Sequence, residues 1–259
     1  MPELDRDDGA TVHWEEHGQG DGVLIAGIGY GYPDMFRGLT DDLAADHTVV
    51  VPDLRGAGGS TRGGPYELAA DVADFAAVLE ASGPVDAAIG MGDGTLRVVE
   101  LGAARPDLVG TVVLSGYAPL FRGEIRRASG LSSSAQVLGA LLTLLEKDYR
   151  SAIRTIVETG SPELDEATIR ERVDRVVAYC SHEAAVARLR YWIDVDVGDS
   201  ALELGDRLWI LHHPRNPWFS EDLVDRVPEL LPEAQLEAVA DGALSRPDQT
   251  AAVVRRITG

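Results

Sequence analysis

The feature that most constrains the fold of this chain is the alternation of short apolar runs with longer amphipathic stretches. Apolar runs occur at 23–26, 47–52, 86–89 and 111–114, and stretches with helical periodicity occur at 35–45, 67–82 and 95–105. Strands that alternate with helices in this way form βαβ units around a parallel sheet. The sequence therefore predicts an α/β fold with a mostly parallel central sheet flanked by helices.

This alternation stops between about 120 and 201, where no strand signal is found. The segments 131–147, 149–158, 165–180 and 182–193 have helical patterns, and Ser181 is a plausible N-cap between the last two. Alternation resumes with the apolar run 208–211. We therefore predict a core formed by 1–119 and 202–259, with an inserted helical cap at 120–201 that closes over a cavity.

Length and composition limit the class of protein. The chain has 259 residues, 45% of them hydrophobic, and a single cysteine, Cys180. No apolar run approaches the roughly 18 residues that a membrane span needs, and one cysteine cannot form an internal disulfide. We expect a cytoplasmic protein in which Cys180 is a packed thiol.

The charge excludes other partners. With 43 acidic and 23 basic residues the formal net charge is −20, a surface that repels nucleic-acid phosphates and anionic lipid headgroups. No spacing of His, Cys and carboxylates resembles a metal site. The expected partner is a small organic molecule, with no metal and no cofactor; a protein partner is possible but nothing indicates one.

One turn between a predicted strand and a predicted helix has a catalytic frame. It reads Gly90-Met91-Gly92-Asp93-Gly94, which fits the G-x-S-x-G pattern in which a strained turn presents a serine nucleophile. The serine position is Gly92. Because glycine has no side chain, it cannot attack a carbonyl.

Together with the turn Asp53-Leu54-Arg55-Gly56 and the strand and loop at 208–217, this frame makes residues 9–257 resemble the α/β-hydrolase fold family with a helical cap. In that family a serine attacks, a histidine takes its proton and an acid orients the histidine. The resemblance implies that the acid position is Asn216, and the alternative acid position is Gly116. No histidine follows His213, although one is expected near 241–247. With all three triad positions substituted, ordinary serine hydrolysis is not expected.

The remaining site residues follow from the same resemblance. It implies oxyanion-type backbone donors at Ile28 or Gly29 and at Asp93. The Asp93 side chain has two interpretations, a cap of the following helix or, if the turn is re-registered, a catalytic group. His213, where relatives usually have glycine, is a candidate general base or ligand contact, but solvent exposure is an equal alternative. His212 matches a packing position. The predicted ligand pocket comprises Tyr30, Tyr32, Asp34, Tyr117, Tyr191, Trp192, His212 and Trp218.

Three functional hypotheses remain. The first is a cofactor-free cyclase, isomerase or lyase of small-molecule secondary metabolism that holds a largely apolar carbonyl compound between core and cap. The alternative is a pseudoenzyme that acts as a small-molecule receptor, carrier or regulatory binding protein. The third is a protein-interaction module. Fold alone does not choose among them.

Overall fold

The computed structural model describes residues 2–115, 132–160, 164–214 and 221–259. Within these ranges an eight-stranded sheet has the order β1-β2-β4-β3-β5-β6-β7-β8. β2 pairs antiparallel with β1 and β4, and every later pair is parallel. The predicted α/β fold with a mostly parallel sheet is confirmed. The strands are β1 (Glu3–Asp5), β2 (Thr11–His17), β3 (Asp21–Ala26), β4 (His47–Pro52), β5 (Val85–Met91), β6 (Val109–Ser115), β7 (Leu208–His212) and β8 (Gln235–Ala238).

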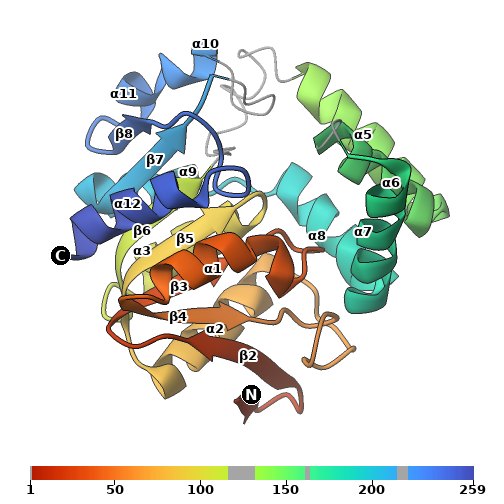
Figure 1. Ribbon diagram of the computed structural model, residues 1–259, viewed down its shortest axis with the longest axis horizontal. Helices are drawn as coiled ribbons and strands as arrows, with labels where there is room; N and C mark the ends of the chain where they lie inside the picture. The colour runs from red at the N-terminus through yellow and green to blue at the C-terminus, as the bar shows by residue number, and fades with distance from the viewer. Residues whose placement is uncertain (1, 116–131, 161–163, 215–220) are drawn as a thin grey trace.

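Helices cover both faces of this sheet (Figure 1). On one face α1 (Arg37–Leu43) and α12 (Pro247–Thr258) pack over a cluster that includes Ile25 and Ile89. On the other face α2 (Leu68–Ser82) and α3 (Gly94–Ala104) pack over a cluster that includes Leu24 and Ala88. Neighbouring residues of one strand thus enter opposite clusters, as the period of two requires.

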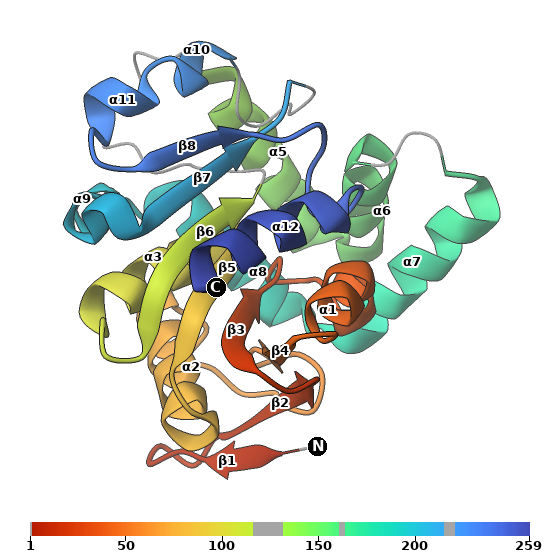
Figure 2. The same cartoon turned by 60° about the vertical axis from the view of Figure 1, so that its left-hand side comes forward.

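In its described residues the segment between β6 and β7 forms helices joined by short connections, one of which contains the β-bridge residue Cys180. Helices α5 to α7 lie to one side of the sheet in Figure 1, and α6 and α7 stand clear of it in Figure 2 as well. Ser181 caps α8 as expected, because its Oγ accepts the Ala184 N–H at 3.3 Å. The helices of this cap are α5 (Ser132–Lys147), α6 (Tyr149–Gly160), α7 (Glu166–Tyr179), α8 (His182–Asp194) and α9 (Gly198–Leu204), the last of which packs against α3.

The cap joins the core through the backbone between α7 and α8. Cys180 forms an isolated antiparallel bridge with Ala57 in the loop after β4. Beside it the Ser181 N–H donates to the Gly56 carbonyl at 2.7 Å, and the Gly58 N–H donates to the Tyr179 carbonyl at 3.1 Å. These backbone bonds hold the start of α8 over the carboxyl ends of β3 and β4.

Short elements complete the chain. They are the 3-10 helices η1 (Pro33–Phe36) and η2 (Gly205–Arg207) and the helices α10 (Glu221–Val224) and α11 (Val227–Leu230). In the described ranges, no helix combines the length and the apolar character that crossing a membrane requires.

Candidate functional site

The sharp turn between β5 and α3 is present. Gly92 has a φ of +56°, and the turn packs so tightly that a Cβ on Gly94 would lie 2.1 Å from the Ala26 carbonyl oxygen. A Cβ on Gly90 would lie 2.7 Å from the Cα of Thr95. Sterics thus explain all three glycines of the frame, and the turn has the sharp backbone that the G-x-S-x-G pattern predicts, with Gly92 at its centre.

Asp93 follows this turn and is 2% exposed. Its Oδ1 accepts the Gly29 N–H at 2.7 Å, and its Oδ2 accepts Arg97 Nη1 at 2.8 Å. It occupies the N-cap position of α3, but its side chain accepts no backbone N–H of that helix. The helix-cap interpretation is therefore wrong, because the guanidinium one turn along the helix and the Gly29 amide bind both carboxylate oxygens.

This arrangement changes the chemistry that the turn can support. Gly29 is one of the oxyanion donors that the resemblance implies, and the Asp93 carboxylate occupies the acceptor position of its N–H. A Cβ on Gly29 would lie 2.4 Å from Asp93 Oδ2 and 2.5 Å from Arg188 Cδ, so the space beside this amide is filled. A fixed negative charge at this point opposes the build-up of a second one.

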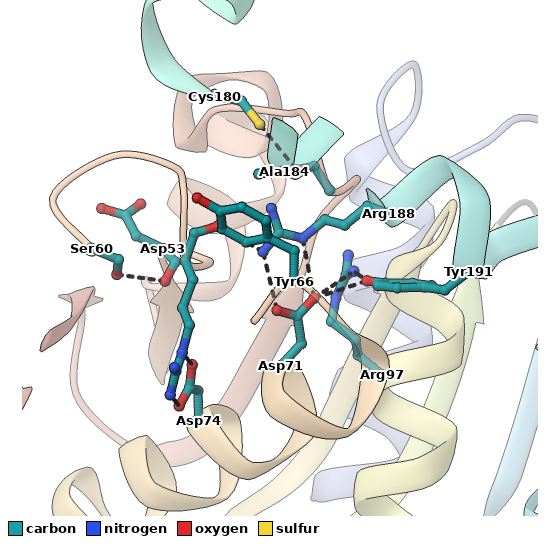
Figure 3. Close-up of polar contacts among 12 residues, drawn as sticks. Asp53, Ser60, Tyr66, Asp71, Asp74, Arg97, Cys180, Ala184, Arg188 and Tyr191 are labelled. Atoms are coloured by element: carbon teal, nitrogen blue, oxygen red, sulfur yellow. Dashed lines mark hydrogen bonds and ion pairs between the residues drawn. The ribbon is translucent and has the colours of Figure 1, made fainter. Parts of the chain in front are cut away.

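Asp93 belongs, through Arg97, to a buried network that links the core to the cap. Figure 3 shows the part of this network around Asp71. Asp71 of α2 accepts two bonds from Arg188 of α8, at 3.1 Å from Nε and 3.1 Å from Nη2. The Tyr191 hydroxyl donates to Asp71 at 2.9 Å and accepts a bond from Arg97 Nη1. Arg97 Nη1 lies 3.6 Å from Asp71 Oδ2. Two carboxylates and two guanidiniums thus balance in charge, with side chains at most 3% exposed.

The titration of the network follows from these contacts. Burial alone would raise the pKa of Asp71, but the charge and hydrogen bonds of Arg188, with the charge of Arg97 and the Tyr191 hydroxyl, hold it below its ordinary value. Burial raises the pKa of Tyr191 well above its ordinary value. At neutral pH Asp71 is therefore a carboxylate and Tyr191 a neutral hydroxyl that can donate to it.

The Asp53-Leu54-Arg55-Gly56 turn has a structural role beside this network. Arg55 makes two bonds to Asp74 of α2, at 2.7 Å from Nε and 2.9 Å from Nη2. The Arg55 carbonyl in turn accepts Arg188 Nη2 at 2.8 Å. Asp53 accepts His13 Nδ1 at 2.7 Å and the Gly59 N–H at 2.8 Å. These contacts connect the loop after β4 to α2, β2 and the cap.

His213 is brought together with a residue that sequence reasoning did not single out. Its Nδ1 lies 3.7 Å from Asp241 Oδ1. His213 lies after β7, three positions before the implied acid position Asn216, and Asp241 lies in the loop after β8, where the resemblance implies a histidine. A carboxylate in the segment 241–247, where a histidine is expected, is the sequence signal that could have identified Asp241. His212 is the half-buried last residue of β7, and its carbonyl accepts the Val239 N–H at 2.8 Å.

A histidine that contacts a hydroxyl lies elsewhere. His47 Nδ1 is 2.8 Å from Asp46 Oδ1, and its Nε2 is 3.0 Å from Thr258 Oγ1. His47 begins β4, whereas Gly92 directly follows the end of β5. This row of three residues therefore lies at the amino ends of the parallel strands, opposite the end that carries Gly92. The Thr258 hydroxyl also bonds to the Val254 carbonyl of its own helix at 3.0 Å. The row therefore fastens α12 to the sheet.

The predicted ligand pocket separates into different places. Burial, with the charge of Asp93, raises the pKa of Tyr30. Tyr191 and Trp192 belong to the cap helix α8 and are buried, whereas Tyr32 and Asp34 border a separate open hollow. A cavity of about 20 Å³ borders Gly27, Ile28 and Gly29, which is room for about one water molecule. Asn216, Gly116, Tyr117 and Trp218 lie outside the described residues.

The described part of the chain holds no cluster of three or more His, Cys, Asp or Glu side chains suited to a metal ion. Cys180 is buried, and its Sγ lies 3.7 Å from the Gly29 carbonyl oxygen. Burial raises the pKa of its thiol. It packs behind the loop that carries Gly29 as a neutral side chain.

Comparison with known proteins supports the sheet topology. Residues 23–149 match the family described as the alpha/beta hydrolase fold. The solved structure of an esterase from Exiguobacterium antarcticum superposes with a TM-score of 0.79 at 16% identity and covers 99% of both chains. A bromoperoxidase from Bacillus anthracis superposes with a TM-score of 0.77 at 16% identity and covers 96% of this chain and 95% of its own. This chain has an α/β-hydrolase fold.

A curated relative matches part of this α/β-hydrolase-fold chain. It is named "Putative carbamate hydrolase RutD" and comes from Azorhizobium caulinodans. The match is 35% identical over 113 residues and spans 42% of this chain and 42% of the relative. At the identities of the solved structures the likeness concerns the fold alone, and activity must be argued from the site.

Proposed function

We propose that this α/β-hydrolase-fold protein is non-hydrolytic and binds a small organic molecule as a receptor, carrier or regulatory binding protein. The observation that carries the proposal is the hydrogen bond from the Gly29 N–H to Asp93. A cytoplasmic location belongs to the same proposal, since the only cysteine is a buried free thiol. The proposal also includes the lack of a cofactor.

The same bond weighs against the cyclase, isomerase or lyase hypothesis. Those reactions need donors that are aimed at a developing negative charge. Here the Gly29 donor already binds a carboxylate that is also paired with Arg97. Releasing it would take from the fully buried Arg97 its nearest carboxylate, and removing one partner of a buried ion pair costs about 3–5 kcal/mol.

Hydrolysis is the competing function, because the relatives named above include an esterase and a carbamate hydrolase. Acyl transfer through the turn needs a nucleophile within hydrogen-bond reach of a base. Gly92 offers none, and Asp93 is bound on both oxygens by Gly29 and Arg97. These contacts support binding over hydrolysis.

The test is incubation of the purified protein with a metabolite extract of the producing organism, followed by untargeted mass spectrometry. A heat-denatured sample of the same protein is the control. The proposal expects a compound that is retained with unchanged mass. A compound that disappears while a related mass appears would overturn it, and the mass difference would give the reaction type.

A further inference from the structure

An open hollow of about 450 Å³ lies between the core and the cap helix α7, away from the Gly92 turn. The core contributes β2, the segment that leads into η1, and the loop after β4, and the cap contributes the last turn of α7. The residues that the argument uses are Tyr32, Asp34, Arg62, Arg175 and Tyr179. This volume falls within the range of small-molecule sites.

Aromatic rings and a guanidinium form one side of the hollow. The rings of Tyr32 and Tyr179 meet edge to face, with centroids 6.4 Å apart. The guanidinium of Arg175 lies over the Tyr32 ring, 4.3 Å from its centroid. The Tyr179 hydroxyl is bonded to Asp53, which fixes its ring. This side offers an aromatic ring and a guanidinium plane, each held in place by its own contacts, against which a planar group can stack.

The charges of the hollow leave one cation uncompensated. Asp34 pairs with both Arg175 and Arg37, and Glu15 accepts His17 Nε2 at 2.8 Å. Arg62 Nη1 donates only to backbone, to the Gly56 carbonyl at 3.1 Å and the Tyr179 carbonyl at 3.0 Å. In the described part of the chain no carboxylate lies within 4 Å of Arg62. Arg62 Nη2 makes one long bond, to the Gly58 carbonyl at 3.5 Å, so its second N–H and the Nε can receive an anion from outside.

The smaller cavity limits how deep a ligand can reach. Pro33 and Tyr179 border both spaces. Because the inner space measures only about 20 Å³, a ring cannot enter it. A ligand stays in the hollow, between Arg62 and the last turn of α7.

We propose that this hollow binds a small aromatic carboxylate, with its carboxylate on Arg62 and its ring against Arg175 and Tyr179. Arginine recognises carboxylates through paired N–H donors, and its plane stacks on aromatic groups. The proposal rests on the binding part of the proposed function and names the ligand class and its site. The network around Asp93 has no part in it.

Calorimetric titration of the purified protein tests the ligand class. The probes are benzoate and 3-phenylpropionate, with benzamide as the uncharged control and cyclohexanecarboxylate as the non-aromatic control. Both aromatic carboxylates are expected to bind. Benzamide is expected to bind at least about tenfold more weakly, since charge-assisted hydrogen bonds contribute on the order of 1.5–3 kcal/mol. Cyclohexanecarboxylate is expected to bind about threefold more weakly, since it keeps the charge and loses the contact of an aromatic ring with the Arg175 guanidinium. Equal binding of benzamide, or no binding of either aromatic carboxylate, overturns the proposal.

Variants test the site. Arg62→Gln is expected to weaken benzoate binding by about tenfold or more. Arg207→Gln is the matched control, because Arg207 also donates only to backbone carbonyls, those of Val109, Gly110 and Gly102, at the far end of the sheet. Arg175→Leu removes the stacking partner without touching a backbone bond and is expected to cost about threefold.

Equal losses in Arg62→Gln and Arg207→Gln, or unchanged binding in both Arg62→Gln and Arg175→Leu, overturn the site. The outcome is separable from that of the proposed function. A compound turned over in the extract removes the binding-protein proposal and leaves the Arg62 comparison valid. If a compound is retained unchanged and the aromatic carboxylates do not bind, only the proposal for the hollow is overturned.

Discussion

At the scale of single residues, the φ of +56° at Gly92 predicts a measurable loss of stability when any other residue is placed there. The left-handed region costs an L-residue about 1–2 kcal/mol, and a Cβ there would also lie 3.0 Å from Ile28 Cγ1. Gly92→Ser is expected to lower the free energy of unfolding, measured in urea, by more than that strain alone. It is not expected to restore ester hydrolysis, because no histidine follows His213.

The matched control for this variant is Gly9→Ser. Gly9 has a φ of +84°, but a Cβ there would meet nothing within 4 Å. The difference between the two variants isolates the contact with Ile28. Ester hydrolysis by Gly92→Ser at a rate above that of the unmodified protein would contradict the prediction that the chain lacks a base for a serine at this position.

The pair of Asp93 and Arg97 carries the second residue-scale prediction. Asp93→Ala leaves a fully buried guanidinium without its close partner and is expected to cost about 3–5 kcal/mol of unfolding free energy. Asp93→Met combined with Arg97→Met is expected to cost far less than the sum of its single variants.

The exposed pair of Arg154 and Glu158 has the same spacing of four residues along a helix and serves as the control for the double-mutant cycle. Its coupling energy is expected to be much smaller, because solvent screens exposed ion pairs. Equal coupling in the two pairs would contradict a special role for burial.

At the scale of elements, α8 is fastened to α2 and α3 through polar groups (Figure 3). Tyr191→Phe removes the hydroxyl that joins Asp71 and Arg97. It is expected to cost about 1–2 kcal/mol of unfolding free energy and to speed amide hydrogen exchange in α8.

Tyr149→Phe is the comparison, since the Tyr149 hydroxyl bonds to the Cys180 carbonyl within the cap, at 2.9 Å. It removes one hydrogen bond without loosening the contact between cap and core. Similar exchange rates in α8 for both variants would refute the role of Tyr191 as a fastening between the two parts.

The elements themselves could be predicted well from the sequence because periodicity is a local signal. The helix expected at 131–147 is α5 (Ser132–Lys147), and the strand expected at 47–52 is β4 (His47–Pro52). The short β1 and α9 and the terminal α12 were not assigned. Their patterns are brief or lie beyond the motifs that the resemblance covers.

The candidate site could be predicted only in part. The glycine turn could be predicted because it is formed by neighbouring residues, whereas the substitution of the triad stays a prediction. The link between Asp71 and Arg188 spans 117 positions and depends on how α8 docks. Charged residues on otherwise apolar helix faces, such as Arg97 four positions after Asp93, were the available signal for a buried network.

At the scale of the whole molecule, the excess of carboxylates gives an acid-sensitive fold. The pKa of Asp71 is lowered in the folded state, and Arg154 lowers that of Glu166 to about 2. Unfolded values are about 3.9 for Asp and 4.3 for Glu. The unfolded chain therefore binds more protons in this window, so stability is present above about pH 4.3 and is lost as the pH falls toward the folded values.

The net charge of the whole protein also lowers the stability of the fold as the pH falls below the isoelectric point. Below the isoelectric point of about 4.5 further acid adds net positive charge and relieves no repulsion. Urea unfolding at pH 7, 5 and 3.5 is expected to give the lowest stability at pH 3.5, with a smaller acid loss in Glu166→Gln. Stability that rises from pH 5 to pH 3.5 would contradict this linkage.

The most direct test of the central claim is the rate of ester and carbamate hydrolysis measured side by side for the protein, for Asp93→Asn and for a heat-denatured sample. Asparagine can still accept the Gly29 N–H, but it cannot act as a carboxylate nucleophile or base. If Asp93 only fills the oxyanion position, neither the protein nor the variant will exceed the denatured sample. Turnover by the protein that Asp93→Asn abolishes would contradict the account and make Asp93 a catalytic residue.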